Sequence, residues 1–367
     1  MKILYDHQIF ASQIYGGVSR YFFELMKNFN KTRDIEFELS LRYSNNHYIE
    51  NAEFSKHKSF FLPEKFIGQN KFCSFLNQNP SKKSLLKQDF DIFHPTYYDP
   101  YFLEHLGKKP FVLTIHDMIH ELYPEMFSRK DNTSERKKLL LQKADKIIAI
   151  SESTKRDILR FNNIEENKIK VIYHGNPLEK KNGSIALNMK LPDNFILYVG
   201  NRGGYKNFDF FLSSIIPLLK NDESLYVVCA GGGKFRGSEN HRIKELNIKN
   251  KVLHYSIDNK ILSCLYQKAR VFVFPSLYEG FGIPVLESFS CGCPIALSNT
   301  SSLPEVAGNA ALYFNPIDEF SIRETISKVI YNEEIRKELQ SKGFEQLEKF
   351  SWEKTAKETA ALYRELI

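Results

Sequence analysis

Short apolar runs alternate with amphipathic segments along the whole chain, and this pattern predicts strands that alternate with helices around parallel sheets. The runs are rich in β-branched and aromatic residues, as expected for strands that are buried on both faces. The first half of the chain contains predicted strands at residues 2–5, 35–41, 91–94, 111–115, 146–150 and 170–173. The second half contains a further series at residues 195–199, 225–229, 252–255, 271–274, 294–297 and 311–314.

A polar stretch separates the two series and predicts a linker at residues 178–192. We therefore expect an α/β protein with an N-terminal domain at 1–177 and a C-terminal domain at 193–350. The remaining residues, 351–367, are amphipathic and predict a terminal helix. Two doubly wound domains joined in this way are expected to bind their ligand in the cleft between them.

The composition is that of a folded globular protein, with 42% hydrophobic and 26% charged residues in a chain of 367. The net charge of +7 suits anionic ligands but is too small for a nucleic-acid signature. The five cysteines contain no Cys-x-x-Cys pair and predict free thiols in a reducing compartment. No signal peptide or long apolar span is recognised, so we expect a cytoplasmic protein.

The most specific motif follows the predicted strand 271–274. Residues 279–287 read Glu-Gly-Phe-Gly-Ile-Pro-Val-Leu-Glu, which predicts a glycine-rich turn and then the start of a helix. Glycines let the backbone approach a ligand closely, and Pro284 suits the first turn of a helix. Amides at the positive end of a helix bind anions. The predicted ligands of a diphosphate are therefore the backbone amides of Phe281, Gly282 and Ile283.

Two carboxylates, Glu279 and Glu287, mark the ends of this motif. A carboxylate beside an anion site accepts hydrogen bonds from hydroxyl groups and does not itself bind phosphate. Two carboxylates that flank a diphosphate site therefore indicate a ligand with hydroxyls on both sides of its phosphates. A nucleotide-sugar has this layout.

The two glutamates with seven residues between them, in the context Tyr-Glu-Gly-Phe-Gly, resemble the signature of the retaining GT-B glycosyltransferases. This family includes bacterial polysaccharide mannosyltransferases. The resemblance implies two Rossmann-like domains that face each other across a cleft, with residues 351–367 packed back on the first domain. It also implies that Glu279 contacts the donor sugar and that Glu287 contacts the ribose of the nucleotide.

The loop after the first strand of the second domain carries two cations, Arg202 and Lys206. Arginine offers a planar fork to phosphate oxygens, and lysine offers a point charge. In the resembling family a comparable arginine and lysine hold the donor diphosphate, so both residues are predicted phosphate ligands and catalytic groups. The alternative is a pair of solvated cations.

Two candidate site elements lie in the first domain. Gly16 and Gly17 precede an amphipathic segment and resemble the glycine loop of the family, which faces the diphosphate and the acceptor. His116 follows the strand 111–115, at the carboxyl end where doubly wound sheets bind ligands. The resemblance implies an active-site role for His116. Ordinary turn glycines and a structural histidine are the alternatives, and His174 is expected to be structural.

Several tempting motifs do not support other chemistry. The glycines of residues 230–235 lack the spacing and the Ser or Thr of a phosphate loop. Asp89 and Asp91 are explained by the entry of a strand, and no dinucleotide-binding glycine motif follows the first strand. We therefore expect neither a metal ion nor another cofactor.

Residues 54–72 interleave lysines with phenylalanines. Such a segment could contact anionic lipid headgroups or a lipid-linked acceptor, which would make the protein peripheral on the inner face of the cytoplasmic membrane. The alternative is a half-buried helix with solvated lysines.

These observations predict a retaining glycosyltransferase that moves a hexose from a nucleotide diphosphate to a glycan or lipid-linked glycan in surface polysaccharide synthesis. Mannose from a GDP donor is the first expectation, because residues 4–10 resemble bacterial mannosyltransferases. A UDP-sugar is the alternative donor. A nucleotide-sugar epimerase and a non-catalytic nucleotide-sugar-binding protein are the alternative functions.

Overall fold

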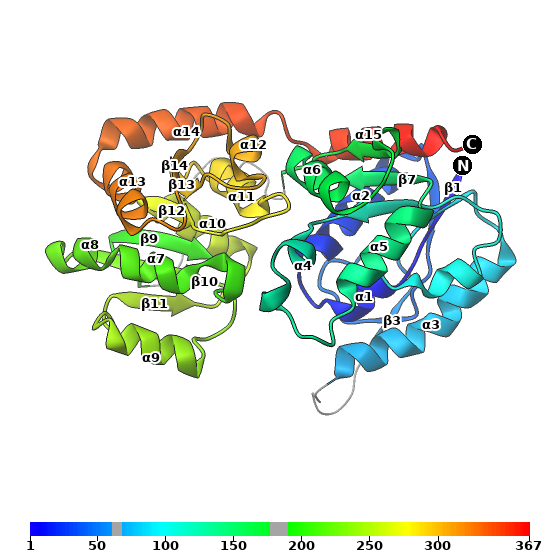
Figure 1. Cartoon of the computed structure of the whole chain (residues 1–367), viewed down its shortest axis with the longest axis horizontal. Coiled ribbons are helices and arrows are strands. Elements are labelled where there is room, and N and C mark those ends of the chain that lie inside the picture. Colours follow the sequence, from blue (N-terminus) through cyan, green and yellow to red (C-terminus); the bar gives the residue numbers. More distant parts are fainter. Residues whose placement is uncertain (61–67, 177–189) are drawn as a thin grey trace. The chain divides into compact units, whose positions relative to one another are not determined.

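The computed structural model describes residues 1–60, 68–176 and 190–367 of the chain. These residues divide into two compact units. The first unit is Met1–Gly175 together with Ser351–Ile367, and the second is Asn176–Phe350. Each unit contains parallel strands and surrounding helices (Figure 1). Of the predicted linker, residues 178–189 lie outside the described residues.

The sheet of the first unit has two parallel three-stranded parts with the orders β2-β1-β5 and β6-β7-β8. A bridge between Phe93 and Phe111 connects them. The strands are β1 (Lys2–Tyr5), β2 (Glu36–Leu39), β5 (Ile92–His94), β6 (Val112–Ile115), β7 (Lys146–Ala149) and β8 (Ile169–Val171). Each strand overlaps a predicted apolar run. β1 matches its run, β8 begins one residue before its run, and the runs other than that of β1 extend beyond the paired residues. The apolar pattern missed a short parallel pair, β3 (Tyr43–Ser44) and β4 (Lys58–Ser59).

Helices cover both faces of this sheet because the strand residues alternate between two cores. Ile3 and Tyr5 face the core that contains α2 and α15, whereas Leu4 faces the core that contains residues of α3, α5 and α6. The helices of the unit are α1 (Gln8–Ser12), α2 (Gly17–Thr32), α3 (Gln69–Lys87), α4 (Ile119–Leu122), α5 (Thr133–Lys143), α6 (Glu152–Phe161) and α15 (Trp352–Arg364), with short 3-10 turns at Pro100–Glu104, Pro124–Met126 and Glu166–Lys168.

The C-terminal helix α15 belongs to the first unit, although the second unit precedes it in the chain. Its N-cap is Ser351, whose hydroxyl accepts a hydrogen bond from the Lys354 amide at 3.1 Å. Trp352, Ala356, Ala360 and Tyr363 repeat at helical spacing and pack into the core beside α2. The apolar stripe of the terminal segment therefore covers one face of the first sheet.

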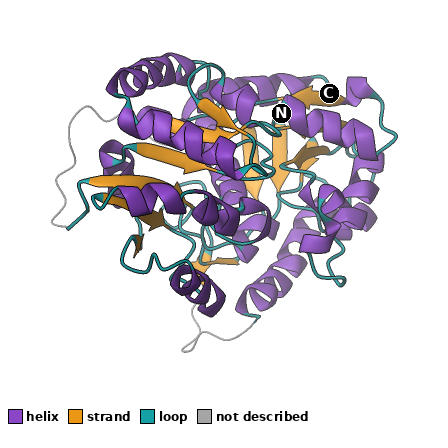
Figure 2. Cartoon of the chain, turned by 60° about the vertical axis from the view of Figure 1, so that its left-hand side comes forward, coloured by secondary structure: helices purple, strands orange, loops and turns teal. Residues whose placement is uncertain are grey.

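The second unit is built on one parallel sheet of six strands with the order β11-β10-β9-β12-β13-β14. The strands are β9 (Asn194–Val199), β10 (Leu225–Ala230), β11 (Val252–Tyr255), β12 (Val271–Phe274), β13 (Ile295–Ser298) and β14 (Leu312–Phe314). Its helices are α7 (Phe208–Ser214), α8 (Ile216–Asn221), α9 (Gly237–Glu245), α10 (Asn259–Lys268), α11 (Ile283–Ser290), α12 (Leu303–Ala307), α13 (Glu319–Tyr331) and α14 (Glu333–Leu347), with a 3-10 turn at Gly204–Lys206. Figure 2 shows the strands with helices around them.

The strand order places a topological switch point between β9 and β12. From β9 the chain proceeds to β10 and β11 on one side, and then it returns to β12 on the other side. Loops that leave neighbouring strands in opposite directions open a crevice at their carboxyl ends, where α/β sheets bind ligands. The loops after β9 and β12 carry the motifs selected from the sequence.

The basic and aromatic segment 54–72 is only partly described, because Phe61, Lys65 and Phe66 lie outside the described residues. Phe54 packs its ring 5.5 Å from that of Phe37, and Phe60 is buried. Residues 58–59 form strand β4, so the alternative of a half-buried helix is wrong there, whereas residues 69–72 begin helix α3 and Lys71 is exposed, as that alternative predicts. Contact of this segment with a membrane remains a prediction. Within residues 1–60, 68–176 and 190–367, no helix combines the length and the apolarity that crossing a membrane requires.

Candidate functional site

Three loops of the second unit come together at the carboxyl ends of β9, β12 and β13. The Leu277 amide donates to the Tyr205 carbonyl at 2.8 Å and so ties the loop after β12 to the loop after β9. The hydroxyl of Thr300, in the loop after β13, donates to the Leu277 carbonyl at 3.0 Å. These bonds hold the predicted donor motifs next to one another at the switch point.

Lys206 and Glu279 form an ion pair at this junction, with 2.6 Å between Nζ and Oε1. Their side chains are 19% and 12% exposed, so both charges are largely shielded but still reach the surface. The Lys206 ammonium also lies 4.9 Å from the ring centroid of Tyr205 and 5.7 Å from that of Phe274. The structure therefore places two of the predicted site residues in direct contact.

Two serines hold the backbone that carries Glu279. The Glu279 amide donates to the Ser301 hydroxyl at 2.9 Å. The Ser302 hydroxyl donates to the carbonyls of Glu279 and Phe281 at 2.9 and 3.0 Å. Both serines follow β13 and match no motif in the sequence. Their role arises from the pairing of β12 with β13, which sequence reasoning did not use.

The helix α11 starts at the glycine turn as predicted, with Gly282 as its N-cap and Pro284 in its first turn. Gly282 has φ +99°, and a Cβ there would lie 2.9 Å from Cδ2 of Leu303, so no other residue fits without strain. Within the described residues, the amides of Gly282 and Ile283 donate no hydrogen bond. They remain available at the positive end of the helix.

Glu287 lies on α11 and is more deeply buried than Glu279, with 6% of the residue exposed. The Tyr266 hydroxyl on α10 donates to its Oε2 atom at 3.3 Å. Burial and the neighbouring Glu287 together hold the pKa of Tyr266 well above its usual range. This tyrosine therefore stays protonated and available as a donor that orients Glu287.

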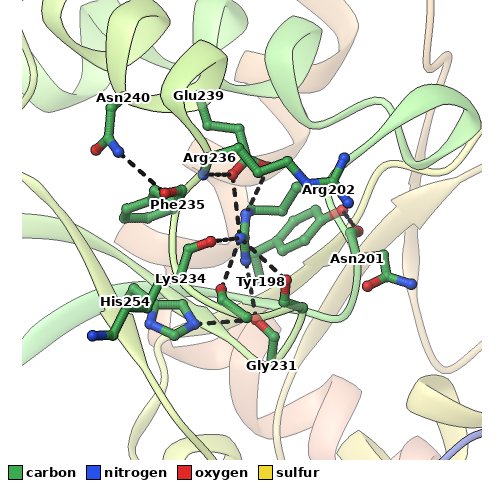
Figure 3. A network of polar contacts seen from close by, with 12 residues as sticks. Tyr198, Asn201, Arg202, Gly231, Lys234, Phe235, Arg236, Glu239, Asn240 and His254 are labelled. Atoms are coloured by element: carbon green, nitrogen blue, oxygen red, sulfur yellow. Dashed lines mark hydrogen bonds and ion pairs between the residues drawn. The ribbon is translucent and has the colours of Figure 1, made fainter. Parts of the chain in front are cut away.

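Arg202 lies in a different arrangement from the one that its motif predicts (Figure 3). Its side chain is 1% exposed and pairs with Glu239, at 3.0 Å between Nε and Oε1. Its terminal nitrogens donate to backbone carbonyls of the loop after β10, at 3.0 Å to Gly231 and 2.9 Å to Gly233. The guanidinium fork is therefore engaged within the protein, because the carbonyls of a loop from another strand surround it.

Glu239 is itself fixed by two donors. Besides Arg202, the Arg236 amide donates to its Oε2 atom at 2.6 Å. Burial alone would raise the pKa of the Glu239 carboxyl, but the bonds from Arg202 and Arg236 outweigh burial and lower it. Glu239 is therefore a stable anion, and no sequence motif had pointed to it.

The first unit contains the other predicted residues. Gly16 is the N-cap of α2 and Gly17 its first residue. His116 is buried, and burial lowers its pKa to about 4, so its ring is neutral at pH 7. Its Nε2 atom has no hydrogen-bond partner within the described residues. The His174 ring lies nearly parallel to it at 6.2 Å, which brings together two histidines that the sequence treated separately.

A buried lysine supports the segment that follows His116. Lys137 on α5 is fully buried and pairs with Glu121 at 2.6 Å. Its ammonium also donates to the Asp117 carbonyl at 3.1 Å. A buried lysine needs such partners to remain charged. The sequence pattern did not single out Lys137, because a lysine in an amphipathic helix usually faces solvent.

In the part of the chain that the structure describes, no three His, Cys, Asp or Glu side chains form a group that could hold a metal ion. The candidate groups of the second unit are the Lys206–Glu279 pair, the α11 amides and Glu287.

Two models of known protein families match the chain. The model "Glycosyltransferase Family 4" matches residues 15–180, and the model "Glycosyl transferases group 1" matches residues 179–346. Among curated proteins, O-antigen chain mannosyltransferase B of Escherichia coli is 28% identical over 377 residues, which cover 95% of this chain and 96% of that protein.

Solved structures share the fold. Sucrose-phosphate synthase from Thermosynechococcus elongatus superposes with a TM-score of 0.78 at 20% identity, over 100% of this chain and 98% of that one. HepE from Anabaena, in complex with UDP and glucose, superposes with a TM-score of 0.72 at 16% identity, over 99% of each chain. The prediction of a GT-B fold with two Rossmann-like domains is confirmed.

Proposed function

Since models of family 4 and group 1 glycosyltransferases match residues 15–180 and 179–346, we propose that the protein transfers a hexose from a nucleotide diphosphate to a glycan or lipid-linked glycan with retention at the anomeric carbon. The first donor to test is GDP-mannose, because the E. coli relative is named as an O-antigen mannosyltransferase. The second is UDP-glucose, because the Anabaena neighbour was solved with UDP and glucose. The proposed acceptor belongs to surface polysaccharide synthesis.

The observation that carries the proposal is the Lys206–Glu279 pair beside the N-terminus of α11. An ammonium and unpaired amides at a helix N-terminus stabilise a diphosphate, and a carboxylate accepts hydrogen bonds from sugar hydroxyls. When the donor binds, the Lys206–Glu279 ion pair separates. Lys206 then contacts the diphosphate, and Glu279 accepts hydrogen bonds from the sugar. Glu287, held by Tyr266, accepts from the ribose hydroxyls.

The proposed reaction is a front-face displacement. The bond between the anomeric carbon and the diphosphate oxygen breaks, and the acceptor oxygen forms its bond on the same face of the sugar. The acceptor proton passes to the departing diphosphate. Lys206 and the amides of Gly282 and Ile283 stabilise the charge that develops on the leaving group, which is usually the largest catalytic contribution. The roles of Gly16, Gly17 and His116 in this reaction rest on the sequence resemblance.

The decisive experiment combines binding with turnover. GDP, UDP and ADP are titrated by calorimetry, and transfer from GDP-mannose and UDP-glucose is followed for the wild type and Glu279→Ala. Loss of turnover with retained nucleotide binding supports a transferase and contradicts a non-catalytic binding protein. A covalent glycosyl adduct in mass spectra would contradict the front-face displacement. If the protein binds none of these nucleotides, the proposal is overturned.

The proposed chemistry is independent of metal ions, because Lys206 and the helix amides supply the positive charge that the leaving diphosphate needs. Transfer is therefore expected to continue in EDTA. Loss of transfer in EDTA that added Mg²⁺ restores would contradict this part of the proposal.

A further inference from the structure

Arg202 lies at the carbonyl end of a left-handed backbone turn. Gly231, Gly232 and Gly233 have φ values of +75°, +68° and +74°, which glycine adopts readily and other residues do not. The arginine donates to the carbonyls of all three glycines and of Lys234, at distances between 2.9 and 3.4 Å. Figure 3 shows the guanidinium surrounded by these carbonyl oxygens.

The amides of the same turn are only partly used within the protein. The Gly231 amide is used, since it donates to the Tyr255 carbonyl at 3.4 Å. Gly232 and Gly233 are exposed, and within the described residues their amides donate no hydrogen bond. A cation bound to the carbonyls thus stabilises a turn in which two exposed residues have unpaired amides.

The contacts around Arg202 hold it in one position. Glu239 pairs with Nε, and the Phe235 ring covers the guanidinium with its centroid 4.9 Å from Cζ. The turn is also packed tightly on the loop after β9. A Cβ at Gly232 would lie 2.5 Å from the Gly200 carbonyl oxygen and 3.0 Å from Nη1 of Arg202. The turn therefore has one position relative to the loop that leads to Lys206.

We propose that Arg202 is a positioning residue of the donor site, which holds the turn 231–233 so that the amides of Gly232 and Gly233 bind acceptor atoms of the nucleotide. This inference rests on the proposed function. In this proposal Arg202 acts through the turn and does not contact the phosphate directly. The acceptor atoms belong either to the diphosphate or to the base, since both present hydrogen-bond acceptors.

The two roles of Arg202 predict opposite effects of Glu239→Gln. If Arg202 bound phosphate directly, removal of the carboxylate would release the fork and tighten nucleotide binding. If Arg202 positions the turn, the same change loosens it and weakens binding of GDP or UDP, whichever binds the wild type, by about 5-fold or more. The control is Gly237→Ala, because a Cβ at that exposed position meets no atom within 4 Å.

Substitutions of Arg202 provide a second test that distinguishes positioning of the turn from direct binding of phosphate. Arg202→Lys keeps the charge but cannot bridge Glu239 and the carbonyls, so we expect it to bind as weakly as Arg202→Ala. Gly232→Ala should produce the same loss of nucleotide affinity, because it alters the turn that Arg202 contacts. The double variant Arg202→Ala and Glu239→Gln should lose less affinity than the sum of the two single losses. Melting temperatures of the unliganded variants identify any that fail to fold, and Glu239→Gln remains informative in that case.

The outcomes are distinguishable from a failure of the proposed function. Weaker binding in Glu239→Gln supports the inference. A loss confined to the diphosphate assigns the amides to phosphate, and an equal loss for the nucleoside assigns them to the base. Tighter binding in Glu239→Gln, or recovery in Arg202→Lys, overturns the inference. If Lys206→Ala binds as the wild type does, or no nucleotide binds at all, the donor site itself is wrong and the inference falls with it.

Discussion

The ammonium of Lys206 lies 2.6 Å from the carboxylate of Glu279, and this pair joins the loops that leave β9 and β12. In the unliganded protein each charge neutralises the other. A donor that separates them must supply a phosphate to one and hydroxyl groups to the other. In the proposed function, the pair therefore couples recognition of the diphosphate to recognition of the sugar.

Glu279→Gln is expected to bind a nucleoside diphosphate about 2- to 5-fold more tightly than the wild type, because Lys206 no longer has to leave an ion pair. Transfer should fall about 100-fold or more, because the sugar loses its charged acceptor. Calorimetry with GDP and UDP and a transfer assay measure both effects. The control is Glu338→Gln, because the Glu338 side chain on α14 is exposed. Weaker binding of the diphosphate would show that Glu279 does not compete for Lys206.

Lys206→Ala is expected to lose about 10- to 100-fold in affinity for a nucleoside diphosphate, the range for a hydrogen bond to a charged group. The affinity for the corresponding nucleoside should stay the same, since no phosphate is present. Calorimetric titration of both ligands tests the difference, with the exposed Lys337→Ala as control. An equal loss for nucleoside and diphosphate would mean that the substitution disturbs the whole site.

Thermal stability is expected to decrease as the pH falls from about 6.5 toward 4. Burial lowers the pKa of His116 to about 4 and that of His94 to about 3, from an ordinary 6.5. In this window the unfolded chain binds protons at these residues and the native protein does not, so acid favours unfolding. The melting temperature measured at intervals of pH should drop less steeply in His116→Gln than in the wild type. Parallel curves would remove His116 from the explanation.

Tyr363→Phe is expected to lower the free energy of unfolding by about 1–3 kcal/mol, because it leaves buried polar atoms without partners. The Tyr363 hydroxyl lies 2.5 Å from Nδ1 of His94 and 2.8 Å from the hydroxyl of Tyr5. These bonds join the C-terminal helix to strands β1 and β5. The measurement is the melting temperature, and the exposed Tyr331→Phe is the control. Equal effects of the two substitutions would mean that the buried hydroxyl has no special role.

Much of the fold follows from local pattern. The strands β1, β11 and β12 match their predicted runs completely. The clearest case is β12, which is fully buried and therefore continuously apolar. The pair β3 and β4 was missed because each strand has only two residues. Lys58 and Ser59 of β4 are also exposed, so they leave no apolar signal in the sequence. Helix α11 was predicted from its glycine and proline, whose backbone preferences act over neighbouring residues alone.

The sequence by itself determined the residues of the motif that runs from Glu279 to Glu287, because a strand, a turn and a helix start are consecutive in the chain. The tertiary structure decided how the two cations of one loop differ. Lys206 reaches Glu279, whereas Arg202 is enclosed by carbonyls of the loop after β10. It also brought Ser301 and Ser302 to the backbone of Glu279. These contacts depend on which strands lie side by side, and that order results from packing between distant segments, which no local pattern records.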